Sequence, residues 1–142
     1  MVNRWNYTST KRKMMIDIQP LPKIAEDERG ATHYFNTTRS EQFVCGYRKA
    51  GASNAKHYHK GLSVGKNPEV LILFSGEITI HWFDVREKDK KGTEKVSAPA
   101  MVTIYPFAWH EVVADTDIIF MELNTLDDGK SDTFRIEETG AL

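Results

Sequence analysis

Short apolar runs separated by turn residues fill most of this sequence, and they constrain the fold more than any other feature. No window of twelve or more residues repeats its apolar positions with the 3.6-residue period of a helix. Many short strands with turn signals between them are typical of an all-β sandwich or barrel. The expected strands cover residues 14–18, 31–36, 42–48, 69–75, 77–84, 101–106, 110–115 and 117–123.

Length and charge limit what such a chain can do. The sequence has 142 residues, of which 40% are hydrophobic, enough for one domain with one core. We expect an N-terminal arm or edge strand over residues 1–18, a barrel over 19–126, and a C-terminal tail or edge strand over 127–142, whose apolar residues are few. With 19 basic and 20 acidic residues, the net charge of −1 gives no electrostatic reason to expect binding to nucleic acid or to an acidic membrane surface.

The expected compartment follows from cysteine usage and from the N-terminus. Cys45 is the only cysteine, so an internal disulfide is excluded, and its expected role is that of a small buried apolar side chain. No apolar run near the N-terminus is long enough for a signal peptide or a membrane span. These features predict a cytoplasmic protein.

Two histidines and an acid mark the stretch 51–76 as a candidate metal site. In a strand, residues two apart share a face, so His57 and His59 can present both imidazoles to one place while Tyr58 faces away. Glu69 opens the next apolar run, and His110 follows later in the chain. Imidazoles and a carboxylate suit a divalent transition metal such as iron, zinc, manganese or nickel, and can leave coordination positions open.

These residues give the chain a resemblance to the cupins, single-domain jelly-roll barrels of the RmlC-like type. The first cupin motif is glycine, five residues, His-x-His, three or four residues, glutamate, six residues and glycine. It is matched here by Gly51, His57, His59, Glu69 and Gly76, although nine residues separate the second histidine from the glutamate.

The second cupin motif is matched more weakly. His110 is kept, and Trp109 precedes it as in many cupins. Pro99, Tyr105 and Phe107 stand where the family has glycine, proline and glycine. Because the replaced glycine can require a positive φ, Phe107 predicts a turn that is either strained or differently shaped.

The resemblance covers residues 40–124 and implies a double-stranded β-helix with a metal in the barrel mouth, held by His57, His59, Glu69 and His110. The chain would then be an enzyme that acts on a small polar or carbonyl-bearing metabolite, as a metal-dependent isomerase or dioxygenase. Residues 60–68 would form a mobile cover over the mouth. A homodimer is also expected, with the N-terminal arm covering an edge strand of the second copy.

A second interpretation comes from residues 27–30, Asp-Glu-Arg-Gly, which look similar to a segment of the ketoisomerases and epimerases of sugar-nucleotide metabolism. Such an enzyme can be independent of metal, with His57 or His59 as the base. Further acid–base candidates are Tyr105, Tyr47 and Glu122, and the candidate substrate contacts are Arg48, Lys60 and Lys66. A cupin that binds a small ligand without turnover is the third possibility.

Overall fold

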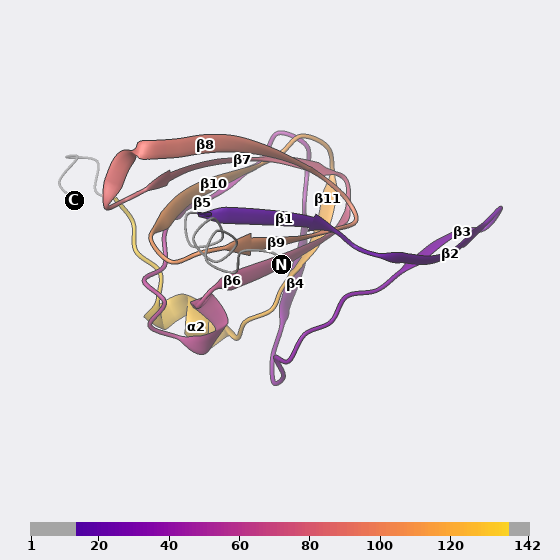
Figure 1. Cartoon of the computed structure of the whole chain (residues 1–142), viewed down its shortest axis with the longest axis horizontal. Coiled ribbons are helices and arrows are strands. Elements are labelled where there is room, and N and C mark those ends of the chain that lie inside the picture. The colour runs from indigo at the N-terminus through magenta and orange to yellow at the C-terminus, as the bar shows by residue number, and fades with distance from the viewer. Residues whose placement is uncertain (1–13, 137–142) are drawn as a thin grey trace, which may run out of the picture.

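Two antiparallel sheets face each other in the computed structural model, which describes residues 14–136 (Figure 1). One sheet has the order β1 (Ile16–Pro20), β9 (Ala100–Ile104), β6 (Glu69–Ser75), β11 (Ile118–Glu122) and β4 (Val44–Arg48). The other has the order β5 (Ser53–His57), β10 (Ala108–Ala114), β7 (Glu77–Asp84) and β8 (Glu87–Ser97). Strands distant in sequence are neighbours in both sheets, and the all-β jelly-roll prediction is confirmed.

The main core lies between the two sheets, and β6 and β7 show why these sequences form these strands. In β7, Ile78 and Ile80 alternate with Thr79 and His81, and both isoleucines are fully buried in the core. In β6 the run from Val70 to Phe74 is instead continuously apolar, because most of this strand is covered on both faces. Leu73 packs in the main core, whereas Ile72 packs on the outer face in a second cluster with Leu21 and Leu123.

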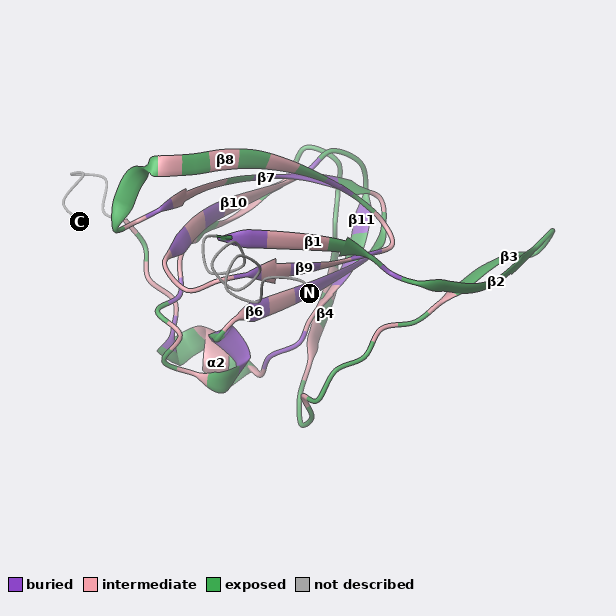
Figure 2. Cartoon of the chain, viewed as in Figure 1, coloured by how far each residue is buried: buried purple, intermediate pink, exposed green. Residues whose placement is uncertain are grey.

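A hairpin of β2 (Lys23–Asp27) and β3 (Gly30–His33) projects away from the barrel (Figure 1). Most of its residues are exposed (Figure 2), including Ile24. The strands pair up to Asp27 and Gly30 and leave Glu28 and Arg29 as the turn. An isolated two-stranded hairpin is marginal in water, so this hairpin is a candidate surface for the expected homodimer, which stays a prediction.

The N-terminal arm is only partly described. Its last residues belong to β1, which pairs with β9 of the same barrel. Residues 1–13 of the expected arm lie outside the described residues.

The C-terminal segment contains a helix that the sequence did not predict. Helix α2 (Leu126–Ser131) begins at a capping box, in which the Thr125 hydroxyl accepts a hydrogen bond from the Asp128 N–H and the Asp128 carboxylate accepts one from the Thr125 N–H. Beyond it, Phe134 forms an isolated antiparallel bridge with Tyr58. A helix of six residues is too short to show an apolar period.

Within residues 14–136, no helix is long and apolar enough to cross a membrane.

Cys45 was expected to be buried, and this prediction was wrong. Strand β4 places Gly46 on the inner side, where it contacts Phe120, and turns Cys45 to the outer side, where it is exposed. Alternation alone could not decide which side of β4 would face the core.

Candidate metal centre and ligand pocket

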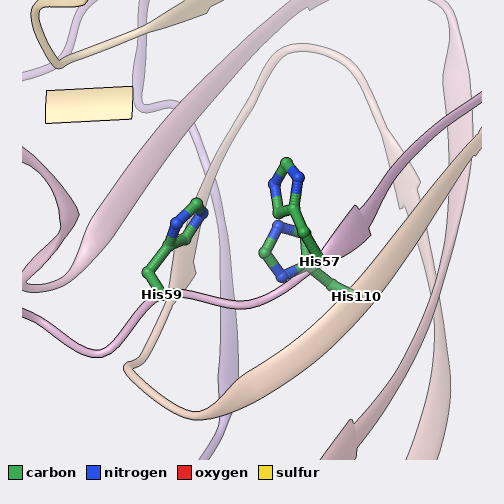
Figure 3. A group of neighbouring side chains, drawn as sticks. All are labelled: His57, His59 and His110. Atoms are coloured by element: carbon green, nitrogen blue, oxygen red, sulfur yellow. The ribbon is translucent and has the colours of Figure 1, made fainter. Parts of the chain in front are cut away.

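Three histidines from two regions of the chain meet inside the barrel (Figure 3). His57 ends β5, His59 lies two residues further on, and His110 lies in β10, directly opposite His57 in the register of the two strands. Their ligand nitrogens all lie within 4.8 Å of one another. The two-residue alternation therefore correctly placed the imidazoles of His57 and His59 close together. The pairing of β10 with β5 brings His110 to the same place.

Backbone carbonyl groups set the orientation of two of the rings. The Nδ1–H of His59 donates to the Asp132 carbonyl oxygen at 2.6 Å, and the Nδ1–H of His110 donates to the Ala108 carbonyl oxygen at 2.9 Å. A carbonyl oxygen can only accept, so both Nδ1 atoms carry a hydrogen, and Nε2 of each ring is the nitrogen left to bind a proton or a metal ion. Such a hydrogen bond at the second nitrogen is typical of metal-ligating histidines.

Glu69 completes a group of acceptors that face one another. Its Oε2 lies 3.2 Å from His110 Nε2 and 3.3 Å from His59 Nε2, and all three side chains are buried. Within residues 14–136, neither His59 Nε2 nor Glu69 Oε2 has a hydrogen-bond partner, and the same holds for Nδ1 of His57. Buried acceptors in contact require a cation between them, either a proton or a metal ion. Neutral imidazoles with one carboxylate are a donor set that fits a divalent transition metal.

Burial and neighbouring charges set the protonation of this cluster. Burial, followed by the charges of His110 and His59, lowers the pKa of His57 to about 3, so this ring is neutral at pH 7. Burial alone would raise the pKa of Glu69, but the contacts with His110 and His59 and the charge of Lys66 outweigh it and hold this pKa well below 4.5. Glu69 is therefore an ionised carboxylate.

A pocket of about 200 Å³ opens beside the cluster and receives side chains from both sheets. One part of its wall is apolar, formed by Leu71, Ile104, Val112, Ile118 and Phe120. The polar lining residues are Arg48, Asn54, His57, Glu69, His110 and Glu122. Such a mixture of apolar surface and a few converging polar groups is typical of a small-molecule site.

Besides Glu69, two polar lining residues come from the five-stranded sheet, Arg48 on β4 and Glu122 on β11. The Arg48 side chain is exposed, donates from Nε to Asn54 Oδ1 at 2.8 Å, and lies 4.9 Å from the centroid of the Phe120 ring. Burial, followed by the charge of Glu69, raises the pKa of Glu122 above 4.5. The pocket therefore pairs a cation in contact with solvent with a carboxyl group that is easier to protonate than usual.

The backbone is strained at the residues that lead to the histidines. Ala55 and Lys56 both have positive φ values, 71° and 59°, at a bulge where β5 shifts its register against β10. Phe107 also has a positive φ, 72°, and its N–H donates to the His59 carbonyl oxygen at 2.7 Å. The sequence predicted that the turn at Phe107 would be either strained or differently shaped, and the positive φ shows that it is strained. Left-handed conformations of residues other than glycine cluster at functional sites.

The remaining predicted site residues lie elsewhere. Tyr47 is 69% exposed and sits on the outer side of β4, so it does not face the pocket. Tyr105 follows β9, outside the pocket lining, with its N–H bonded to the Met15 carbonyl oxygen. The Lys60 ammonium lies 4.2 Å from the centroid of the Phe134 ring, and Lys66 is buried against Glu69. Of the three proposed substrate contacts, Arg48 lines the pocket of about 200 Å³, and Lys66 lines a second pocket that also borders His57 and Glu69.

Residues 60–68, the expected mobile cover, are hydrogen-bonded to the rest of the chain at both ends, and their mobility stays a prediction. The loop contains the 3-10 helix η1 (Val64–Lys66). The carboxylate of Asp132, which is 0% exposed, accepts hydrogen bonds from the N–H groups of Lys60, Leu62 and Ser63 at 2.8, 2.7 and 3.1 Å. The role of Asp132 was missed because a carboxylate in a polar C-terminal stretch carries no sequence signal of such a contact.

The half-buried Arg39 contacts the second half of the same loop. The Arg39 guanidinium donates to the carbonyl oxygens of Gly65 and Leu123 at 3.1 and 3.0 Å, and also to that of Pro68. Arg39 thus links the loop to Leu123, which lies 84 residues from Arg39 in the sequence. No sequence period links these residues, so this anchor was also missed.

No protein-family model and no curated protein matches the sequence, whereas solved structures match the fold. QdtA, a sugar 3,4-ketoisomerase from Thermoanaerobacterium thermosaccharolyticum crystallised with TDP, superposes with a TM-score of 0.67 at 16% identity over 89% of this chain and 91% of that one. A variant of the same protein was crystallised with TDP-4-keto-6-deoxyglucose.

Two other solved structures have the same fold. The dTDP-4-dehydrorhamnose 3,5-epimerase from Sulfolobus tokodaii has a TM-score of 0.60 at 16% identity, covering 91% of this chain and 86% of that one. CapF, a capsular polysaccharide assembling protein from Staphylococcus aureus, has a TM-score of 0.55 at 24% identity, covering 83% of this chain and 34% of CapF. The chain therefore has the RmlC-like cupin fold that the sequence motif predicted.

Proposed function

We propose that this chain is an isomerase or epimerase that moves a proton at the carbon next to the carbonyl group of a nucleotide-linked sugar. The observation that carries this proposal is the pocket, where Arg48, Glu122 and the histidine cluster line one apolar cavity. The solved structures of similar fold support the same class of substrate, because two of them are named for nucleotide-linked keto sugars or were crystallised with one.

Each polar group of the pocket has a task in such a reaction. A proton can be removed next to a carbonyl only if a positioned base accepts it and an acid returns it. Glu122 suits both tasks, because its raised pKa brings its protonated and ionised forms closer in energy near neutral pH. The planar guanidinium of Arg48 suits the diphosphate of a nucleotide, to which it can donate two parallel hydrogen bonds.

We also propose that His57, His59, Glu69 and His110 hold a divalent transition metal. The free acceptors that face one another at 3.2 and 3.3 Å support this assignment. A metal bound there would act as a Lewis acid on a carbonyl oxygen of the substrate. Because a metal-bound imidazole cannot serve as a base, the acid–base role then passes to Glu122.

The proposed reaction is tested by hydrogen exchange with solvent. The protein is incubated with TDP-4-keto-6-deoxyglucose in D2O, and NMR follows deuterium uptake at the carbons next to the carbonyl and the appearance of an isomeric sugar. Arg48→Met is expected to raise KM about 10-fold or more, since a hydrogen-bonded charge contact contributes about 1.5–3 kcal/mol. His81→Asn, an exposed change on β7, is the control. Binding without exchange would favour a non-catalytic ligand-binding cupin. The absence of both binding and exchange would reject the substrate class.

Metal content is tested by elemental analysis of the purified protein. Near-stoichiometric metal is expected, and His59→Ala or His110→Ala should remove most of it, because each deletes one ligand. His81→Ala serves as the control, since His81 is exposed on β7 and outside the cluster. A metal-free protein that also refuses added zinc, iron, manganese and nickel would reject the metal site. The cluster would then serve as acid–base groups of a metal-independent isomerase.

A further inference from the structure

Lys66 is a buried lysine that contacts the proposed metal ligand Glu69. Its side chain is only 4% exposed, and its Nζ lies 2.7 Å from Glu69 Oε1 and 3.2 Å from Asn124 Oδ1. Lysine is almost never buried unless it is paired, so the ion pair with Glu69 accounts for the burial of Lys66. The ammonium is already engaged with two acceptors, which argues against the phosphate contact that the sequence suggested for it.

The contact divides the two oxygens of Glu69 between different partners. Oε1 is held by Lys66, whereas Oε2 faces the Nε2 atoms of His59 and His110. A carboxylate can bind a metal through one oxygen or through both. With Oε1 hydrogen-bonded to an ammonium group, only Oε2 is free to act as a ligand.

The position of Lys66 is itself fixed by the fold. It ends η1, where its N–H donates to the Ser63 carbonyl oxygen at 3.2 Å, and the preceding Gly65 is tied to Arg39 through its carbonyl oxygen. Asp132 anchors the start of the same loop. The ammonium is therefore placed by a rigid segment, as a positioning group should be.

We propose that Lys66 is a positioning residue that keeps Glu69 as a one-oxygen ligand, so that the site holds its metal with few ligands and leaves a coordination position for the substrate. This inference rests on the metal site proposed above. Lys66 also balances the negative charge of Glu69, so the ligand set as a whole adds no net charge. The full charge of the ion is then available to polarise a bound carbonyl group.

Cobalt(II) gives a test that does not depend on turnover, because its visible absorption reports its coordination number. Wild-type protein loaded with cobalt is expected to show the intense bands of a four-coordinate ion. In Lys66→Met, Oε1 is free to bind as well, and we expect a severalfold loss of visible absorbance. Lys66→Gln keeps one donor for Oε1 and should retain a spectrum closer to wild type. Lys60→Met removes an exposed ammonium from the same loop and should leave the spectrum unchanged.

The outcomes separate this inference from the metal proposal. A wild-type protein that takes up no cobalt contradicts the metal site itself. Equal spectra for wild type and Lys66→Met overturn the role of Lys66 while leaving the metal site in place. Should Lys66→Met fail to fold, Asn124→Asp offers the ammonium a competing carboxylate and is expected to reduce the absorbance in the same direction. An unchanged spectrum in that variant also overturns the inference.

Discussion

Asp132→Ala is expected to lower the free energy of unfolding by about 3 kcal/mol or more, because three backbone N–H groups lose a charged acceptor and each such hydrogen bond contributes about 1.5–3 kcal/mol. The freed N–H groups can bond to water, so the loss in free energy of unfolding stays below the sum of the three hydrogen-bond contributions. The change also removes the anchor of residues 60–68, which carry Lys66. Urea denaturation measures the free energy, and limited proteolysis detects opening of the loop.

Asp127→Ala is the matched control for this substitution. Asp127 lies on α2, which ends one residue before Asp132, but its side chain is exposed. Loss of an acidic residue from the first turn costs about 0.3–1 kcal/mol. If the two variants were equally stable and equally resistant to protease, Asp132 would not anchor the loop.

Glu122→Gln is expected to slow solvent hydrogen exchange into the sugar by about 10²–10⁴-fold, the usual contribution of a general acid–base group. Glutamine has nearly the shape of glutamate but cannot exchange a proton, so KM should change little. NMR measurement of deuterium uptake in D2O gives the rate. Exchange at the wild-type rate would exclude Glu122 as the acid–base group and return that role to the histidines.

The same carboxyl group should make stability depend on pH. Because the pKa of Glu122 is raised above 4.5 in the folded protein, the folded chain binds this proton more tightly than the unfolded chain. Its stabilising contribution is complete below pH 4.5 and is lost as the pH rises through the folded pKa. Urea denaturation of metal-free protein from pH 4 to pH 8 should show this loss in wild type and a smaller one in Glu122→Gln. Parallel profiles for the two proteins would contradict it.

The sequence by itself determined the fold class and the core of the site. Two-residue alternation places His57 and His59 on one side of the chain, and Glu69 and His110 follow at strand ends, where a jelly roll brings its loops together. These features depend on local periodicity and on a motif, both of which can be read along the chain.

Only the tertiary structure decided how the remaining polar residues are used. Strand alternation could not show that β4 turns Tyr47 outward and Arg48 toward the pocket, because the period has no absolute direction. Lys66 was interpreted as a phosphate contact, yet the fold buries it against Glu69. The anchor at Asp132 joins segments about 70 residues apart, and such contacts arise from chain packing that no local pattern encodes.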